Sequence, residues 1–197
     1  ILKISPYVPG ESKQNAIKLS ANENPLGCAP EIYQKLANIK DLNRYPDGNS
    51  TRLKQKIVAL NNKFKQENII CGSGSDEVIG MIISAFTREG DEIIYPEYGF
   101  LMYKIYALAN GVVPIAAKEK NLKADIEQIL AKVTDKTRVV FIANPNNPTG
   151  SYLTKDELES LRKKLPDNIL LVIDGAYAEY VEDEILDYSS CLLYTYD

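Results

Sequence analysis

One stretch, residues 138–177, constrains the fold more than any other part of the chain. It contains two short apolar runs, Val139–Ala143 and Ile169–Ile173, which are rich in β-branched residues and typical of buried strands in a parallel sheet. Between them, residues 154–165 carry leucines at helical spacing behind a Thr-x-x-Glu capping box. A strand–helix–strand unit joins parallel strands by a right-handed crossover, so both strands should end at the same edge of the sheet. We therefore predict that the polar residues after these strands meet at that edge, where open α/β sheets bind ligands.

The rest of the chain repeats this alternation of strands and helices. Apolar runs predict strands at 69–71, 91–96 and 112–116, and helical periodicity predicts helices at 50–61, 100–110 and 124–133. A further helix should follow the glycines after residue 71, with a buried stripe made by Val78, Ile79, Ile82, Ile83 and Phe86. In the helix at 50–61, one face should be formed by Leu53, Ile57 and Leu60. The alternation predicts an α/β fold with three layers, α/β/α, around a mostly parallel sheet.

Composition excludes several classes of protein. The 197 residues are 45% hydrophobic and 25% charged, which is ordinary for a globular domain. The net charge of −4 gives no basic face for nucleic acid, and no apolar run approaches the roughly 20 residues that span a membrane. Three scattered cysteines favour a reducing, cytoplasmic location. The chain has no histidine, which excludes histidine-dependent triads and the usual zinc sites, so no metal is expected and an enzyme of this kind would use an organic cofactor.

Polar residues follow both strands of the central unit. The turn Asn144–Gly150 and the strand end at Asp174 would each, taken alone, more often be structural, because such residues form turns and caps. Together, Asn-Pro-x-Asn-Pro-Thr-Gly and a strand ending in Asp-x-Ala-Tyr resemble the fold-type I, pyridoxal-phosphate-dependent aminotransferases. The branch that the chain most resembles is that of the histidinol-phosphate aminotransferases, and the resemblance extends over about residues 19–180.

The resemblance implies pyridoxal 5'-phosphate as the cofactor and gives several residues a role. Asp174 would pair with the pyridine nitrogen, Asn147 and Tyr177 would donate to the phenolic oxygen, and Tyr98 would stack on the ring. In enzymes of this branch, the tyrosine that matches Tyr45 crosses a homodimer interface to the cofactor phosphate of the other subunit. Two residues of the Asn-Glu-Asn-Pro segment near the substrate pocket are weaker candidates, namely Asn22 and Glu23.

The glycine-rich turn before the helix at 74–86 could hold an anion. Free backbone amides at a helix N-terminus favour a phosphate, although a plain tight turn explains the same residues about as well. The segment is neither a P-loop nor a dinucleotide fingerprint, because no Gly-Lys-Ser/Thr follows and Glu77 stands where the third glycine belongs. The resemblance favours the phosphate, which would be held by Ser75 and the neighbouring amides of Asp76 and Glu77.

The activity that the resemblance implies is transfer of an amino group between histidinol phosphate and 2-oxoglutarate in histidine biosynthesis. Residues 1–40 would form an N-terminal arm and first helix, and residues 41–180 an incomplete cofactor-binding large domain. Residues 181–197 depart from the family pattern, and Gly175 stands where the family more often has glutamate. The lysine that binds the cofactor covalently, and the C-terminal small domain with its substrate-binding arginines, would lie beyond the end of this chain. The chain would then be an N-terminal fragment without activity of its own.

Two alternatives remain open from the sequence. The parent could be another enzyme of the same fold, such as a threonine-phosphate decarboxylase or an aromatic aminotransferase, since the residues that select the substrate are not in the chain. It could also be a catalytically inactive domain that keeps only the cofactor pocket.

Overall fold

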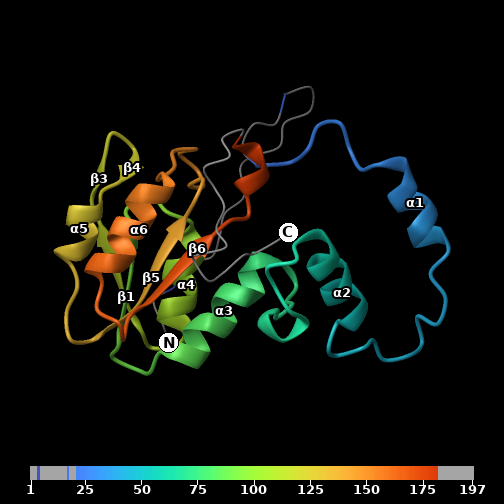
Figure 1. Cartoon of the computed structure of the whole chain (residues 1–197), viewed down its shortest axis with the longest axis horizontal. Helices are drawn as coiled ribbons and strands as arrows, with labels where there is room; N and C mark the ends of the chain where they lie inside the picture. Colours follow the sequence, from blue (N-terminus) through green and yellow to red (C-terminus); the bar gives the residue numbers. More distant parts are fainter. Residues whose placement is uncertain (1–3, 5–16, 18–20, 182–197) are drawn as a thin grey trace.

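The computed structural model describes residues 4, 17 and 21–181. Its centre is a parallel sheet in the order β2-β1-β5-β6, formed within the described residues by four strands (Figure 1). The strands are β1 (Glu92–Pro96), β2 (Val113–Ala117), β5 (Thr137–Ala143) and β6 (Leu170–Asp174). Ala143 lies opposite Asp174 in the register of β5 and β6, so these two strands end together. The predicted parallel strand–helix–strand unit is therefore confirmed.

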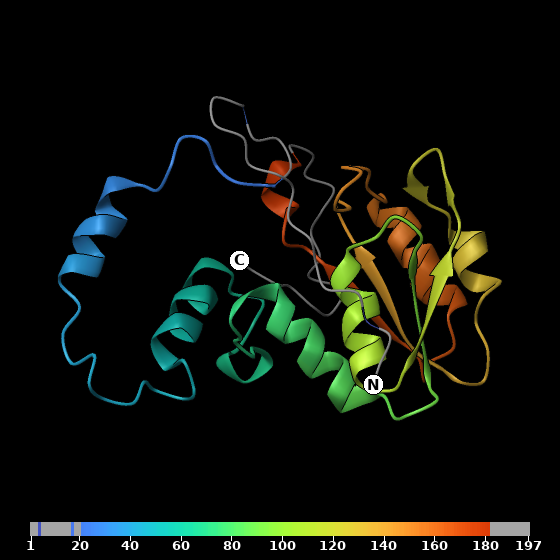
Figure 2. The same cartoon turned by 180° about the vertical axis from the view of Figure 1, so that it is seen from behind.

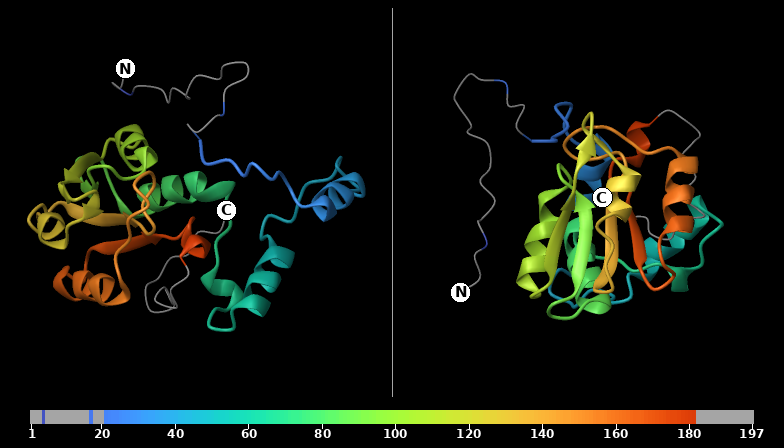
Figure 3. Two further views of the ribbon diagram at one scale, coloured as in Figure 1. Left: turned by 90° about the horizontal axis from the view of Figure 1, so that it is seen from above. Right: turned by 90° about the vertical axis from the view of Figure 1, so that its left-hand side faces the viewer.

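Helices cover both faces of this sheet and make the predicted three layers. Helices α3 (Gly74–Phe86) and α4 (Leu101–Ala109) pack on one face. On the other face lie α5 (Ile126–Leu130) and α6 (Lys155–Lys164), as the view along the sheet shows (Figure 3). The side chains of β5 alternate between the two layers, because successive residues of a strand point to opposite faces.

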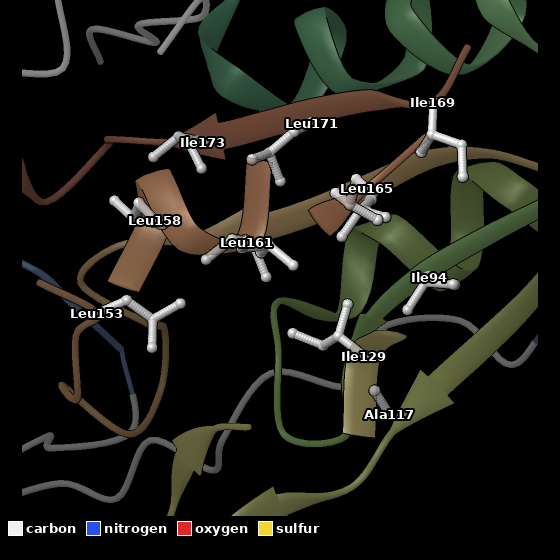
Figure 4. Close-up of a cluster of buried hydrophobic side chains, with 12 residues drawn as sticks. Ile94, Ala117, Ile129, Leu153, Leu158, Leu161, Leu165, Ile169, Leu171 and Ile173 are labelled. Atoms are coloured by element: carbon white, nitrogen blue, oxygen red, sulfur yellow. The ribbon is translucent and has the colours of Figure 1, made fainter. Parts of the chain in front are cut away.

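The layer under α5 and α6 is a cluster of aliphatic side chains (Figure 4). From α6, Leu158 and Leu161 pack on Val140 and Ile142 of β5, and all four side chains are at most 2% exposed. Fully burying such a side chain contributes about 1.5–3 kcal/mol relative to exposure. The helix begins at the predicted capping box, in which Thr154 Oγ1 accepts from the Glu157 N–H and Glu157 Oε2 accepts from the Thr154 N–H. This cluster fixes α6, and with it the turn that precedes α6.

The opposite layer contains the larger side chains. Phe141 of β5 and Tyr103 of α4 are fully buried, and their rings stack with centroids 4.8 Å apart. Three isoleucines of α3 complete the layer, as predicted from their spacing: Ile79, Ile82 and Ile83. Val78 is partly buried against this cluster, but the predicted inward position of Phe86 is wrong, because its side chain is 55% exposed at the end of α3.

The segment before α3 extends away from the sheet (Figure 2). It contains α1 (Pro30–Ala37), α2 (Thr51–Leu60) and the short 3-10 helix η1 (Gln66–Asn68). Neither α1 nor α2 has a buried residue, and on the predicted apolar face of α2 the side chains of Leu53 and Leu60 are 53% and 89% exposed. The periodicity thus predicted the helix correctly, but within the described residues that face is covered only in part, at the half-buried Ile57.

Two predicted elements differ from the structure, and one hairpin was not predicted. Residues 69–71 form no strand, because no strand in the described part of the chain lies beside them to pair with, and Ile70 is 76% exposed. The helix predicted from residue 124 begins at Ile126, because the Asp125 side chain accepts from the N–H groups of Glu127 and Gln128 as an N-cap. Before it lies an unpredicted hairpin of β3 (Glu119–Lys120) and β4 (Lys123–Ala124).

Among the described residues, no helix is long and apolar enough to cross a membrane. The predicted arm and the tail at 181–197 fall almost entirely outside the described part of the chain.

Candidate functional site

The ends of three neighbouring strands meet at one edge of the sheet. Tyr98 follows β1, the turn Asn144–Gly150 follows β5, and Asp174 ends β6. The Asn144 N–H donates to the Asp174 carbonyl oxygen at 2.9 Å, and Asn146 Nδ2 donates to the Tyr98 carbonyl oxygen at 3.2 Å. These contacts place the predicted residues of three strands on one edge, where open α/β sheets bind ligands.

Asp174 is the buried acidic group of this edge. Its side chain is held at both oxygens, because Oδ2 accepts from the Tyr103 hydroxyl at 2.8 Å and Oδ1 accepts from the Ala176 N–H at 3.2 Å. The residue is 5% exposed. A buried carboxylate is costly unless it is hydrogen-bonded and has a charged partner. At an edge of the sheet where ligands bind, such a carboxylate is suited to hold a positively charged ligand group.

The turn after β5 is built by two asparagines to which the sequence analysis gives no role of their own. Asn144 is fully buried, and its amide bridges the backbone of Leu153, accepting at 2.7 Å and donating at 3.0 Å. Asn146 is 7% exposed, and its Nδ2 also donates to Thr149 Oγ1 at 2.9 Å. The third asparagine, Asn147, is half-buried, so it is the most accessible of the three. Asn144 and Asn146 thus shape the turn, and Asn147 stays the predicted cofactor contact.

Tyr98 is held through its backbone while its side chain is 50% exposed. Its N–H donates to Oε1 of Glu119, at the start of the β3–β4 hairpin, at 3.1 Å. Burial raises the pKa of Glu119, the Tyr98 N–H lowers it, and the neighbouring Glu97 charge raises it, so that the net pKa lies above its usual value. The other oxygen, Oε2, is buried and has no hydrogen-bond partner among the described residues.

Glu119→Gln should keep the hydrogen bond to Tyr98 and change how the free energy of unfolding depends on pH. Because the folded-state pKa of Glu119 is raised, its contribution to stability is complete below the unfolded-state pKa and is lost as pH rises through the folded-state pKa. A glutamine keeps the acceptor without the charge, so the stability of the variant relative to wild type should increase from acidic to neutral pH and then level off. Urea unfolding at a series of pH values measures this difference. A difference that falls as pH rises would contradict the assignment.

The matched variant Glu119→Ala removes the acceptor altogether. Relative to Glu119→Gln, it should lower the free energy of unfolding by about 1 kcal/mol, the usual contribution of one hydrogen bond, at every pH, because neither variant titrates at this position.

The N-terminus of α3 carries the predicted phosphate-binding residues. Gly74 begins this helix with φ +76°, a conformation that glycine adopts at little cost, and Ser75 and Asp76 are half-buried behind it. The Glu77 carboxylate accepts from the Ser73 N–H at 2.6 Å and therefore acts as a cap of its own helix. An acceptor cannot donate to a phosphate, so any contribution of Glu77 would come from its backbone N–H. The role of this turn stays a prediction.

The remaining predicted residues lie in two places. Asn22 and Tyr177 are brought together although they are 155 positions apart, with Asn22 Nδ2 donating to the Tyr177 hydroxyl at 2.9 Å. Glu23 is exposed beside Asn22. Tyr45 is fully exposed, and its predicted role needs a second chain, so the structure of one chain leaves it a prediction. In the described part of the chain, no group of three acidic or cysteine residues could hold a metal ion.

Two residues at this edge were missed by the sequence analysis. Tyr103 lies in a helix whose apolar periodicity gives an aromatic residue no role beyond packing, and Glu119 lies in the unpredicted hairpin. No local signal distinguishes either one, since each acts on a residue far away in the sequence.

Comparisons with known proteins agree with this geometry. Residues 14–194 match the family described as aminotransferase class I and II. The chain is 52% identical to a histidinol-phosphate aminotransferase of Pelagibacter ubique, which aligns with 96% of this chain and 53% of that protein. It is 49% identical to the enzyme of the same name from Rhodospirillum rubrum, over 92% of this chain and 50% of that protein. The chain thus spans about half the length of these curated relatives.

Solved structures give the same likeness. A histidinol-phosphate aminotransferase from Sinorhizobium meliloti, crystallised with pyridoxal-5'-phosphate, superposes with a TM-score of 0.79 at 27% identity. The match covers 84% of this chain and 46% of that one. Because the family match extends over nearly the whole sequence, the chain belongs to the class I and II aminotransferases.

Proposed function

We propose that the full-length protein transfers an amino group between histidinol phosphate and 2-oxoglutarate, with pyridoxal 5'-phosphate as its cofactor. The observation that carries the proposal is the buried Asp174 carboxylate at the end of β6, beside the turn Asn144–Gly150. Curated relatives at 52% and 49% identity, which bear the name histidinol-phosphate aminotransferase, support the choice of substrate.

The chemistry of the residues at this edge fits such a cofactor. Asp174 supplies a buried negative charge for a protonated ring nitrogen, and the half-exposed ring of Tyr98 offers an aromatic face. Asn147 and Tyr177 carry an amide and a phenol that can donate to the phenolic oxygen. The N-terminus of α3, with the hydroxyl of Ser75, suits a phosphate. A cation-binding group, a flat apolar face and an anion-binding turn are the parts that a charged pyridine phosphate needs.

Each of these residues has a defined task in amino transfer. When bound, pyridoxal phosphate supplies an electron sink for the carbanion formed at the substrate α-carbon. The Asp174 carboxylate would hold the protonated ring nitrogen and so make that sink effective. The ring of Tyr98 would offer a stacking face, and stacking of this kind contributes about 0.5–1.5 kcal/mol beyond burial. Asn22 orients the Tyr177 hydroxyl through the hydrogen bond between them.

A homodimer in the cytoplasm is part of the same proposal. The exposed apolar side chains of α1 and α2, among them Tyr33, Leu36 and Leu53, are suited to contact with another protein surface. Tyr45, fully exposed after α1, could then reach the phosphate of the second subunit. Among the described residues, Cys28 and Cys71 are free thiols, which a reducing compartment would keep reduced.

The test is an assay of the protein expressed from its full-length gene. With pyridoxal phosphate present, it should form glutamate from 2-oxoglutarate when histidinol phosphate is the amino donor. Aromatic amino acids are assayed as alternative amino donors in separate reactions. A higher kcat/KM for an aromatic donor would replace the proposed substrate, and the absence of transfer from any donor would refute the activity.

A further inference from the structure

Tyr103 forms a contact at the candidate site to which neither the motifs nor the proposed roles assign a function. Its hydroxyl donates to Asp174 Oδ2 at 2.8 Å, across 71 positions of sequence and from helix α4 to the end of β6. Tyr103 is fully buried, so water cannot replace this contact. Packing alone does not require a hydroxyl at this position, since a phenylalanine would fill nearly the same volume.

The ring of Tyr103 is held from several sides. It stacks on Phe141 of β5 with centroids 4.8 Å apart and an interplanar angle of 17°. Tyr95 and Phe100 meet it edge to face, with centroids 6.5 Å and 5.8 Å away. A ring packed in this way cannot swing its hydroxyl away from the carboxylate, because protein interiors leave no space for it. The hydroxyl is therefore a fixed point at which the carboxylate is anchored.

The hydroxyl stays a neutral donor. Burial raises the pKa of Tyr103 well above its usual value, and the charge of Asp174 and the hydrogen bond to it raise the pKa further. The phenol therefore keeps its proton at neutral pH and always donates. A lysine or arginine at this place would neutralise the carboxylate, whereas a phenol orients it and leaves its charge for a positively charged ligand group.

We propose that Tyr103 is a positioning residue for Asp174, holding the carboxylate in a fixed orientation at the sheet edge so that it can pair with the ring nitrogen of the cofactor. The Ala176 N–H donates to the other oxygen at 3.2 Å, so protein donors hold both oxygens of the carboxylate. These donors orient the carboxylate, and a carboxylate oriented at the sheet edge is a suitable partner for a charged ring N–H. The inference rests on the proposed function, because it needs pyridoxal phosphate to bind at Asp174.

The test uses the full-length protein and the variant Tyr103→Phe, which keeps the ring and removes the hydroxyl. We expect the dissociation constant of pyridoxal phosphate to rise roughly ten- to hundred-fold, the range for a hydrogen bond to a charged group. The absorption spectrum of the bound cofactor should change, and kcat should fall while KM for the amino donor stays within about two-fold, because binding of the donor is not involved. Tyr95→Phe is the matched control, since Tyr95 is a buried tyrosine of the same aromatic cluster.

A double-mutant cycle with Asp174→Asn separates positioning from packing. If the hydroxyl acts through the carboxylate, Tyr103→Phe should weaken cofactor binding by less than about two-fold in the Asp174→Asn background. An equal loss in both backgrounds, or a wild-type dissociation constant in Tyr103→Phe, would overturn the proposal.

Two further results would also decide the proposal: a variant that does not fold, and a wild-type protein that does not bind the cofactor. Should Tyr103→Phe fail to fold, recovery of folding in the double variant would support the coupling, and failure of both would overturn it. A wild-type protein that binds no pyridoxal phosphate would refute the proposed function itself, and with it the positioning role.

Discussion

Replacing Asp174 by alanine in the full-length protein should lower the rate of amino transfer at least about a hundred-fold. Removing one partner of a buried charge pair costs about 3–5 kcal/mol, which corresponds to roughly a hundred- to several-thousand-fold in rate. The effect should fall mainly on kcat, because in the proposed function this carboxylate would keep the ring nitrogen protonated, which matters most in the transition state. Part of the cofactor binding should remain, since Tyr98 and the N-terminus of α3 are unchanged. Steady-state kinetics with saturating cofactor measure the loss.

Asp167→Ala is the control for this variant. Asp167 is an exposed carboxylate just before β6, at the end of the strand opposite to Asp174, so its removal changes the charge of the protein equally without touching the site. We expect it to keep nearly the full rate. Turnover of Asp174→Ala close to that of Asp167→Ala would refute the role of Asp174.

The second prediction concerns a polypeptide of just these 197 residues, which should show no measurable amino transfer. Enzymes of this type hold the cofactor through a lysine amine, which also moves the proton of the substrate α-carbon. No lysine follows Asp174 in the sequence, and the last two, Lys163 and Lys164, lie at the end of α6. Because α6 starts beside the ends of the strands and runs back along the sheet, its last turn is at the opposite edge. There Lys164 pairs with Glu127 at 2.7 Å and Lys163 with Glu159 at 3.4 Å.

The measurement is reduction with borohydride in the presence of pyridoxal phosphate, followed by mapping of the label. The 197-residue polypeptide should give scattered, substoichiometric labelling of exposed lysines, whereas the product of the full-length gene should give one stoichiometric adduct and amino transfer. A single stoichiometric adduct in the 197-residue polypeptide, together with activity, would contradict the expectation.

The sequence by itself determined the layered part of the fold. The apolar runs at 139–143 and 169–173 became β5 and β6, and the Thr154–Glu157 capping box begins the helix between them. These signals are local, since they depend on residues a few positions apart, and the handedness of the crossover then leaves one arrangement. For the same reason, the sequence alone places Asp174 and the turn after β5 at one edge of the sheet.

Tertiary structure decided the contacts that refine the site. Tyr103 reaches Asp174 across 71 positions, and Asn22 reaches Tyr177 across 155. Glu119 is brought to Tyr98 by a hairpin whose two strands are only two residues each. Sequence periodicity predicts none of these contacts. They depend on the register between elements that are distant in the sequence and on the rotation of each helix about its axis.

Tertiary structure also decided which apolar faces are covered. Helical spacing correctly predicted α2, yet Leu53 and Leu60 are exposed, and the apolar run at 69–71 forms no strand. Apolar periodicity indicates that a segment has a face that can be buried, but burial requires a second surface that packs on it. A strand likewise forms only where a neighbouring strand can exchange backbone hydrogen bonds with it. The sequence of a segment therefore determines which of its faces is apolar. Only the packing of the folded chain determines which residues, if any, cover that face.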